Sequence, residues 1–239
     1  MRILIIRHGD PDYVADSLTE KGWREAELLG ERIALERPAD VYASPLGRAL
    51  DTSKAACDRL GKAPVVLPWL REFHGTVVGP FEERRRIPWN LMPRYWMGEP
   101  LFFDKDRWMD APIMRTGDVY EVYRKATEGF DALLARYGYV RDGCLYRCER
   151  NLGITIALFC HFGLGLALLA HVAGLALPLV WQSFFLPTSS VTTLRTEERV
   201  RGEVFFKCVS VGDTSHLYAG GEPVSDAGLF PEILAGPGA

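Results

Sequence analysis

Short apolar runs alternate with segments of helical periodicity along most of this 239-residue sequence. The runs that predict buried strands are 2–6, 41–43, 65–67, 154–160, 191–196 and 203–211, with 144–147 as a weaker candidate. The segments with apolar residues at helical spacing are 23–34, 46–60, 119–137 and 164–175. Strands that alternate with helices through short connections indicate a largely parallel sheet covered on both faces. We therefore expect an α/β fold, a three-layer α/β/α sandwich with a mostly parallel central sheet.

The alternation breaks between about residues 73 and 117. This stretch holds several prolines, many aromatic residues and three consecutive arginines, Arg84–Arg86. A long proline-rich stretch without periodicity indicates an irregular lid insertion rather than a separate domain. We expect one α/β domain over residues 1–217 that carries this insertion. The remaining residues, 218–239, contain glycines and prolines and are expected to form a poorly packed C-terminal tail.

Charge and composition exclude several classes of partner. The net charge of −3 provides no positive field for nucleic acid or for an acidic membrane surface. Residues 152–181 are apolar over the length of a membrane span, but histidines, glycines and a proline interrupt them. We therefore predict a strand, a turn and a buried helix there. The N-terminus lacks the features of a secretory signal, so we expect a cytoplasmic protein with no nucleic-acid or membrane partner.

The five cysteines are an odd number without the spacing of a disulfide scaffold, which favours reduced thiols. Cys144, Cys148, Cys160 and His161 form the one combination that suggests zinc. Their spacing is loose, and adjacent residues at a strand end point to opposite sides. We expect no metal site.

The first chemical motif is Arg7-His8-Gly9, which directly follows the first predicted strand. In open α/β sheets, ligands bind in the crevice outside the carboxyl ends of the strands. Arg7 supplies a fork of donors that suits phosphate oxygens. A neutral His8 ring can attack phosphorus, and Gly9 allows the chain to turn sharply beside a ligand. By itself the tripeptide is a weak signal.

A second motif strengthens the first. The segment Ser44-Pro45-Leu46-x-Arg48-Ala49-x-x-Thr52 follows the second strand and opens a helix. It places Arg48 in the first helical turn, facing the same crevice as Arg7. Two arginines that converge there would be unfavourable without an anion between them. The pair therefore predicts an anion site.

Two further strands end at the same crevice. The third leads to Leu70-Arg71-Glu72, and the strand 154–160 ends at His161. After His161 come Phe162, Gly163 and a helix whose first N–H groups can face an anion. These strand ends complete a set of two imidazoles, two guanidiniums and one carboxyl group.

Together these segments resemble the histidine phosphatase superfamily, also called the phosphoglycerate-mutase-like family, and its phosphatase branch in particular. The matching segments are Arg7-His8-Gly9, Leu18-Thr19-Glu20-x-Gly22, Ser44-Pro45-Leu46-x-Arg48-Ala49, Leu70-Arg71-Glu72, Cys160-His161 and Asp213-Thr214-Ser215-His216-Leu217. The resemblance covers about residues 1–75 and 150–217. It implies a phosphatase that hydrolyses a small phosphomonoester metabolite without a metal or other cofactor.

The resemblance also implies a role for each residue. His8 attacks phosphorus and becomes phosphohistidine. Arg7, Arg48 and His161 hold the phosphoryl oxygens and offset the charge of the transition state. Glu72 donates a proton to the leaving alcohol and then activates water, which requires a raised pKa.

The residues after His161, Phe162 and Gly163, are the other expected substrate contacts. At Phe162 many members have glycine instead. Many also have threonine and asparagine where this chain has Pro11 and Val14, so one phosphate donor is absent or replaced. These differences disfavour a glycolytic mutase, which must hold two phosphates.

Several alternatives remain open at this point. Glu82, Glu83, Asp10 or Asp12 could replace Glu72 as the acid. A phosphoglycerate-type mutase, or a phosphate-ligand-binding protein with little catalysis, could share this pocket. The exposed aromatic residues of the insertion also leave room for a homo-oligomer interface.

Other notable side chains are expected to be structural. His74 is expected to line the site without acting, His171 to be a satisfied core histidine, and His216 to form structural hydrogen bonds near the sheet. Arg84–Arg86 is expected to form a solvated face. The aromatic residues of the insertion are expected to form its own core rather than a substrate platform; they are Trp89, Tyr95, Trp96, Phe102, Phe103 and Trp108.

Overall fold

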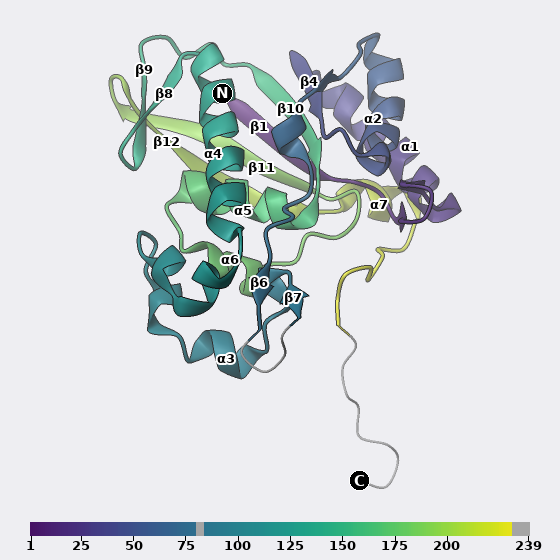
Figure 1. Cartoon of the computed structure of the whole chain (residues 1–239). Coiled ribbons are helices and arrows are strands. Elements are labelled where there is room, and N and C mark those ends of the chain that lie inside the picture. The colour runs from purple at the N-terminus through teal and green to yellow at the C-terminus, as the bar shows by residue number, and fades with distance from the viewer. Residues whose placement is uncertain (80–83, 231–239) are drawn as a thin grey trace, which may run out of the picture.

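The computed structural model describes residues 1–79 and 84–230 (Figure 1). Its strands are β1 (Arg2–Arg7), β2 (Pro11–Asp12), β3 (Ser17–Leu18), β4 (Asp40–Ala43), β5 (Val65–Val66), β6 (Val77–Val78), β7 (Arg85–Arg86), β8 (Tyr139–Asp142), β9 (Leu145–Cys148), β10 (Thr155–Cys160), β11 (Val191–Val200) and β12 (Glu203–Asp213). Its α-helices are α1 (Glu20–Glu36), α2 (Gly47–Leu60), α3 (Pro93–Met97), α4 (Val119–Arg136), α5 (Phe162–Ala173), α6 (Leu177–Ser183) and α7 (Ser215–Gly220).

Within the described residues the central sheet has eight strands in the order β5-β4-β10-β1-β11-β12-β9-β8. The half β5-β4-β10-β1 is parallel throughout, which confirms the predicted α/β fold with a parallel core. From β1 onward the pairings are antiparallel. Hairpins between neighbouring segments build this second half, and β8 was not among the predicted strands. Short turns connect the two strands of each hairpin. Gly143 lies between β8 and β9, Gly202 lies between β11 and β12, and both have a positive φ.

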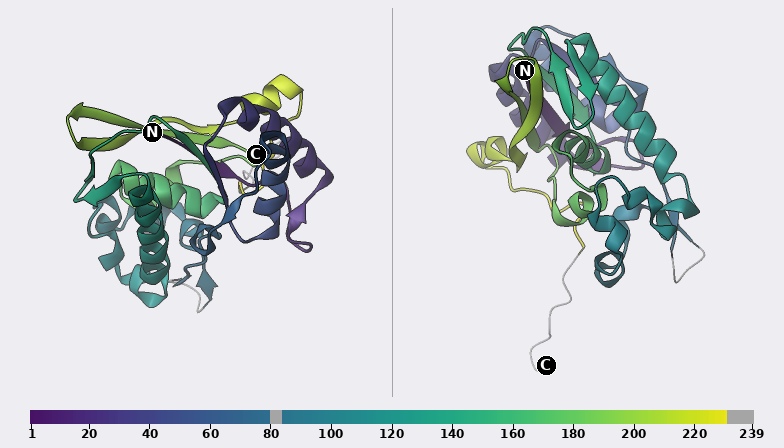
Figure 2. Two further views of the ribbon diagram at one scale, coloured as in Figure 1. Left: turned by 90° about the horizontal axis from the view of Figure 1, so that it is seen from above. Right: turned by 90° about the vertical axis from the view of Figure 1, so that its left-hand side faces the viewer.

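Helices cover both faces of the sheet, which confirms the three-layer sandwich. Alternate residues of β1 point to opposite sides. Ile3 and Ile5 join a core with α4 and α5, whereas Leu4 and Ile6 join a second core with α1 and α2. Figure 2 (left) shows α1 and α2, in purple and blue, on one side of the sheet and the teal α4 and green α5 on the other.

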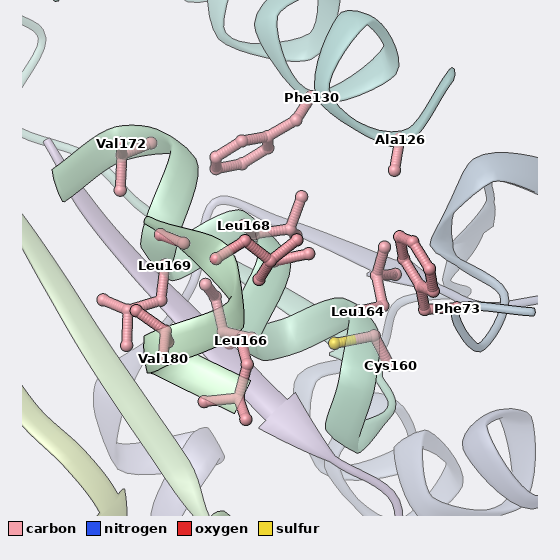
Figure 3. Close-up of a cluster of buried hydrophobic side chains, with 14 of the residues drawn as sticks. Phe73, Ala126, Phe130, Cys160, Leu164, Leu166, Leu168, Leu169, Val172 and Val180 are labelled. Atoms are coloured by element: carbon pink, nitrogen blue, oxygen red, sulfur yellow. The ribbon is translucent and has the colours of Figure 1, made fainter. Parts of the chain in front are cut away.

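The apolar stretch that includes 154–175 forms β10 and α5 inside the larger core, as predicted from its histidines and glycines. Leu164, Leu168 and Leu169 of α5 are buried, and Phe130 of α4 packs over this helix (Figure 3). A further helix, α6, follows and was not predicted. Among the described residues, none of the helices has the length and hydropathy needed to cross a membrane.

The insertion is folded mainly as single turns of 3-10 helix. The turns within it are η2 (Pro88–Asn90), η3 (Pro100–Phe103), η4 (Trp108–Asp110) and η5 (Pro112–Thr116), and a further turn, η1 (Pro68–Leu70), lies just before the insertion. A proline opens most of them, where its missing N–H has no helical partner. Phe102 and Trp108 are buried, as expected for a lid core, whereas Phe103 is half exposed. The insertion packs through η2 and η3 against α6.

None of residues 218–230 of the expected tail is buried, but several of them make specific polar contacts with the domain. Helix α7 covers Ser215–Gly220 and lies against α1. Beyond it, Glu222 forms ion pairs with Lys21 and Arg24 of α1. Ser225 then donates to Asp10, and the carbonyl of Ala227 accepts from Arg7. Composition did not indicate these contacts because they are polar and their partners are distant in sequence.

The buried ring of Phe130 provides a test of the larger core. We expect Phe130→Ala to lower the free energy of unfolding by about 3–5 kcal/mol, because it removes a fully buried ring and leaves a cavity. Tyr120→Ala, at a half-exposed position of the same helix, is the matched control and should cost less than about 1 kcal/mol. Urea unfolding measures both, and equal losses would contradict this account of the core.

Candidate active site

Three adjacent parallel strands end at one place. His8 follows β1, Ser44 follows β4, and His161 follows β10, which lies between the other two. The backbone pairing of the parallel strands continues one residue beyond β1 and β4. The backbone N–H of His8 donates to the Cys160 carbonyl, and that of Ser44 donates to the Phe159 carbonyl. The ring centroids of His8 and His161 are 5.2 Å apart. The parallel topology therefore brings together the residues that the sequence placed at separate strand ends.

The His8 ring is held in one tautomer. Its Nδ1 lies 2.7 Å from the carbonyl oxygen of Gly9, which can only accept a hydrogen bond. Nδ1 therefore carries the hydrogen and Nε2 carries a free lone pair. Burial and the neighbouring Arg7 guanidinium lower the pKa of His8 to about 3, so the ring is neutral at physiological pH. A neutral imidazole with an unprotonated Nε2 is a competent nucleophile.

Ser44 orients the second imidazole. Its Oγ lies 2.7 Å from His161 Nε2 and already accepts the N–H of Leu46. When the Ser44 hydroxyl donates to Nε2, the ring hydrogen of His161 lies on Nδ1. Burial and the nearby His8 lower the pKa of His161, so it also remains neutral. His161 thus presents an N–H donor beside the His8 ring.

The Arg7 guanidinium is anchored from two sides. Nη1 donates to the carbonyl of Leu186 at 2.6 Å, and Nη2 donates to the carbonyl of Ala227 at 2.9 Å. Its carbon atom lies 5.5 Å from the ring centroid of Phe162 and 5.7 Å from that of Phe185, within cation–π range. The charge is therefore fixed in place rather than mobile.

Arg48 is held by Asp16, a residue that sequence reasoning missed. The Asp16 carboxylate accepts from Arg48 Nη1 at 2.6 Å and from the Gly47 N–H at 2.8 Å. Its backbone has a φ of 49°, and a Cβ at Gly47 would lie 2.1 Å from the Asp16 carbonyl oxygen. Glycine at 47 is therefore needed for this close approach. No local sequence pattern announces a side chain that caps a helix 31 residues away.

Thr52 supports the turn after His8. Its hydroxyl accepts the Gly9 N–H at 2.9 Å and donates to the Arg48 carbonyl at 2.6 Å. A Cβ at Gly9 would lie 2.8 Å from the Gly22 carbonyl oxygen. The glycine of the first motif and the threonine of the second are thus required for one local contact between β1, α1 and α2.

Three buried polar atoms of the predicted site have no hydrogen-bond partner. Within the described part of the chain, the side-chain atoms in this condition are Arg7 Nε, Arg48 Nε, His161 Nδ1, Trp96 Nε1 and Ser190 Oγ. Three of these five belong to residues expected to hold a phosphoryl group. Unpaired buried donors are unfavourable, and in native proteins they commonly meet a ligand or an ion. Arginine nitrogens can only donate, so an anion is the ligand that these atoms favour.

The carboxyl group of Glu72 lies against the N-terminus of α5, a helix that is distant from it in sequence. Its Oε1 accepts the N–H of Phe73 at 2.7 Å and the N–H of Leu164 at 3.1 Å. Burial raises the pKa of this carboxyl group, although the two N–H donors and the arginines oppose the shift. Because Oε1 accepts both N–H groups, Oε2 is the oxygen on which this carboxyl group would carry a proton. The carboxylate also takes one of the helix N–H groups that we expected to face an anion.

Two of the alternative acids, Asp10 and Asp12, already accept hydrogen bonds from other groups. Asp10 accepts from Thr19 and Ser225, and Asp12 accepts from the N–H groups of Val14 and Ala15 in its own turn. Glu82 and Glu83 lie outside the described residues. Val14, at the position where many relatives have asparagine, is fully exposed.

Phe162 and Gly163 differ in what they present. The Phe162 ring packs against Trp89 and Phe185 beside Arg7. A Cβ at Gly163 would lie 2.4 Å from Trp89 Cη2 and 3.1 Å from Glu72 Oε1. At Gly163 the insertion therefore approaches the start of α5 closely, and a side chain there would clash with Trp89.

The remaining histidines have structural partners, as predicted. His171 Nε2 lies 3.0 Å from both carboxylate oxygens of Asp131, and His216 bonds Ser189 and Arg32. The exposed His74 contacts only the Glu72 carbonyl among the hydrogen bonds found in the described residues. Arg84 and Arg85 are exposed. Across residues 1–79 and 84–230, no three His, Cys, Asp or Glu side chains cluster closely enough to hold a metal ion.

Comparison with known proteins shows the family of the chain. The histidine phosphatase superfamily (branch 1) matches residues 3–207. A glucosyl-3-phosphoglycerate phosphatase of Mycolicibacterium vanbaalenii is 34% identical over 82 residues, covering 30% of this chain and 36% of that relative. The "probable phosphoglycerate mutase GpmB" of Photorhabdus laumondii is 27% identical over 160 residues, covering 61% of this chain and 73% of that protein.

Solved structures share the fold at low identity. The mycobacterial glucosyl-3-phosphoglycerate phosphatase in complex with inorganic phosphate superposes with a TM-score of 0.60 at 21% identity, over 90% of this chain and 98% of the other. The phosphoserine phosphatase of Entamoeba histolytica gives a TM-score of 0.59 at 20% identity, again over 90% and 98%. Both similarities support the fold alone.

The fold and site define an α/β protein with paired histidines and arginines at the carboxyl ends of parallel strands. The chain belongs to the histidine phosphatase superfamily.

The buried neutral histidines make stability depend on pH. His8, with a pKa of about 3, and His216, with a pKa of about 4, stay neutral in the folded state at pH values where unfolded histidine is protonated. We therefore expect the free energy of unfolding to fall as pH drops below about 6.5, by up to about 1.4 kcal/mol per pH unit for each group. His8→Gln should make this slope shallower by about one proton in urea unfolding between pH 7 and 4.5. Parallel curves would refute it.

Proposed function

We propose that this protein is a phosphatase that hydrolyses a small phosphomonoester through a phosphohistidine intermediate. The three unpaired buried donors around His8 are the observation that carries this proposal. They supply a fixed set of N–H groups with two permanent charges nearby, which is how phosphoryl-transfer sites stabilise transition-state charge. Arg7, Arg48 and His161 would hold the phosphoryl oxygens.

In the first step, His8 Nε2 attacks phosphorus while the bond from phosphorus to the ester oxygen breaks. The proton on Glu72 Oε2 passes to that oxygen, so that the product leaves as a neutral alcohol. In the second step, the Glu72 carboxylate takes a proton from water. The resulting hydroxide attacks phosphorus, the N–P bond breaks, and His8 returns to its neutral form with phosphate released.

The relatives support a small phosphorylated substrate. One is named for glucosyl-3-phosphoglycerate and another for phosphoserine, and one related structure contains inorganic phosphate. The arginine and histidine donors can offset the charge without a cofactor, as the resemblance implied. The free cysteines suit the reducing cytoplasm that we expected.

A mutase is the second candidate, because one relative carries that name. A mutase must return the phosphoryl group from His8 to a second hydroxyl and exclude water. Strict dependence of turnover on 2,3-bisphosphoglycerate, with little release of phosphate, would favour it over hydrolysis. Tight binding of phosphate esters without any turnover would favour a binding protein.

His8→Ala should abolish turnover, because no other described group offers a free ring nitrogen at the phosphoryl position. We expect at least about a 10⁴-fold loss in kcat for a generic phosphomonoester, measured as phosphate release with a chelator present. The exposed His74→Ala is the matched control and should retain most activity. Turnover near the wild-type level in His8→Ala would refute the nucleophile.

Glu72→Gln should separate the two steps. For an alkyl phosphate we expect the first turnover to slow by about 10²–10⁴-fold, because the alcohol needs a proton. For 4-nitrophenyl phosphate, whose leaving group needs none, a burst of nitrophenol should persist before slow turnover. In the wild-type enzyme, kcat/KM for the alkyl ester should fall as pH rises through the raised pKa of Glu72. Equal loss of both first turnovers in stopped-flow experiments would exclude Glu72 as the proton donor.

A further inference from the structure

An apolar cavity of about 580 Å³ lies beside Arg7, and the proposed chemistry uses none of it. Its volume falls in the range of small-molecule sites. We name it the aromatic pocket after the six rings in its lining, which are Trp89, Phe162, Trp181, Phe184, Phe185 and Phe230. The ring centroids of neighbouring pairs are 5.5–6.0 Å apart. The pairs are Trp89 with Trp181, Phe162 with Phe185, and Trp89 with Phe162. The insertion was expected to contribute lid core, yet Trp89 also faces this cavity.

The aromatic pocket and the phosphate site share a wall. Phe162 directly follows His161, and the Arg7 guanidinium lies against the rings of Phe162 and Phe185. Arg7 also keeps an unpaired Nε. A phosphoryl group held by Arg7 is therefore next to the aromatic rings.

The proton donor marks the direction in which the leaving group extends. One point in space, where a Cβ of Gly163 would lie, is 2.4 Å from Trp89 Cη2 and 3.1 Å from Glu72 Oε1. The ester oxygen must lie within hydrogen-bond reach of Glu72 to receive its proton. Trp89 is therefore a neighbour of the carboxyl group that serves the ester oxygen, and its ring is within reach of a carbon chain attached there.

The C-terminal segment closes another side of the pocket. Gly228, Leu229 and Phe230 line it, directly after the Ala227 carbonyl that Arg7 binds. Four polar side chains, Arg86, Asn90, Gln182 and Ser183, share the lining with eleven other residues, and Gln182 already donates to the Trp89 carbonyl. The lining thus offers mostly apolar surface to whatever enters.

From this juxtaposition, and on the basis of the proposed function, we infer that the substrate is a phosphomonoester of an alcohol that bears an apolar ring. The phosphoryl group binds at Arg7, Arg48 and His161, and the ring packs against Trp89, Phe162 and Phe185. Against the aromatic rings, the hydroxyl or carboxylate groups of a sugar or glycerate leaving group would lose water without a hydrogen-bond partner. This selects an apolar leaving group over the polar ones for which the relatives are named.

Two matched esters test the inference. We expect kcat/KM for 3-phenylpropyl phosphate to exceed that for 3-hydroxypropyl phosphate by about 10- to 100-fold, since the leaving groups are alike in acidity and differ by one buried ring. Calorimetry with 3-phenylpropylphosphonate and 3-hydroxypropylphosphonate should show the same ratio in Kd without any turnover. Equal values in both measurements overturn the inference. Tighter binding of the aromatic phosphonate without hydrolysis of any ester would instead support the pocket and refute the phosphatase.

Substitutions locate the effect. Phe162→Ala and Phe184→Ser should each lower the ratio of the two kcat/KM values by about threefold to tenfold, because each removes a ring from the pocket. Phe103→Ser is the control, since Phe103 is 51% exposed, Phe184 is 41% exposed, and only Phe184 lines the pocket. The control should keep the wild-type ratio. A wild-type ratio in both pocket variants would overturn the inference.

Discussion

Two guanidiniums and two imidazoles share one buried space at the end of β1, β4 and β10, and no carboxylate neutralises them all. Asp16 offsets Arg48, but Arg7 is held by carbonyl oxygens. Burial and positive neighbours keep both imidazoles neutral. The cost of these buried donors is relieved when an anion enters, so ligand binding and the stability of the native state are coupled through the same atoms.

The rest of the fold serves to hold this space open. Parallel strands carry His8, Ser44 and His161 to one edge, and the helices that follow begin at the same edge. Hydrogen bonds then fix the orientation of the two rings. The Gly9 carbonyl holds His8, the Ser44 hydroxyl holds His161, and Thr52 supports the turn at Gly9. The antiparallel half of the sheet contributes no expected catalytic residue. Its strands β11 and β12 widen the layer on which α5 packs.

The strand ends and the residues after them were predictable because chemistry and periodicity coincide there. The apolar run before His8 and the helix after Arg48 are local patterns. Asp16 was not predictable, since its role depends on a left-handed backbone and on contact with a distant helix. Nor was the antiparallel half, whose hairpins pair weakly patterned segments such as Tyr139–Asp142. The contacts of Glu222, Ser225 and Ala227 could not be predicted either, because they are made by polar groups whose partners lie about 200 residues away in the sequence.

The bond from Arg7 to Ala227 uses a main-chain oxygen, so almost any residue at 227 could form it. Selection can preserve this contact while the side chains around it drift, and the family match ends at residue 207, before the segment begins. Relatives with unrelated C-terminal sequences could therefore brace the same arginine. Only superposition of their backbones, not alignment of their residues, would reveal the shared brace.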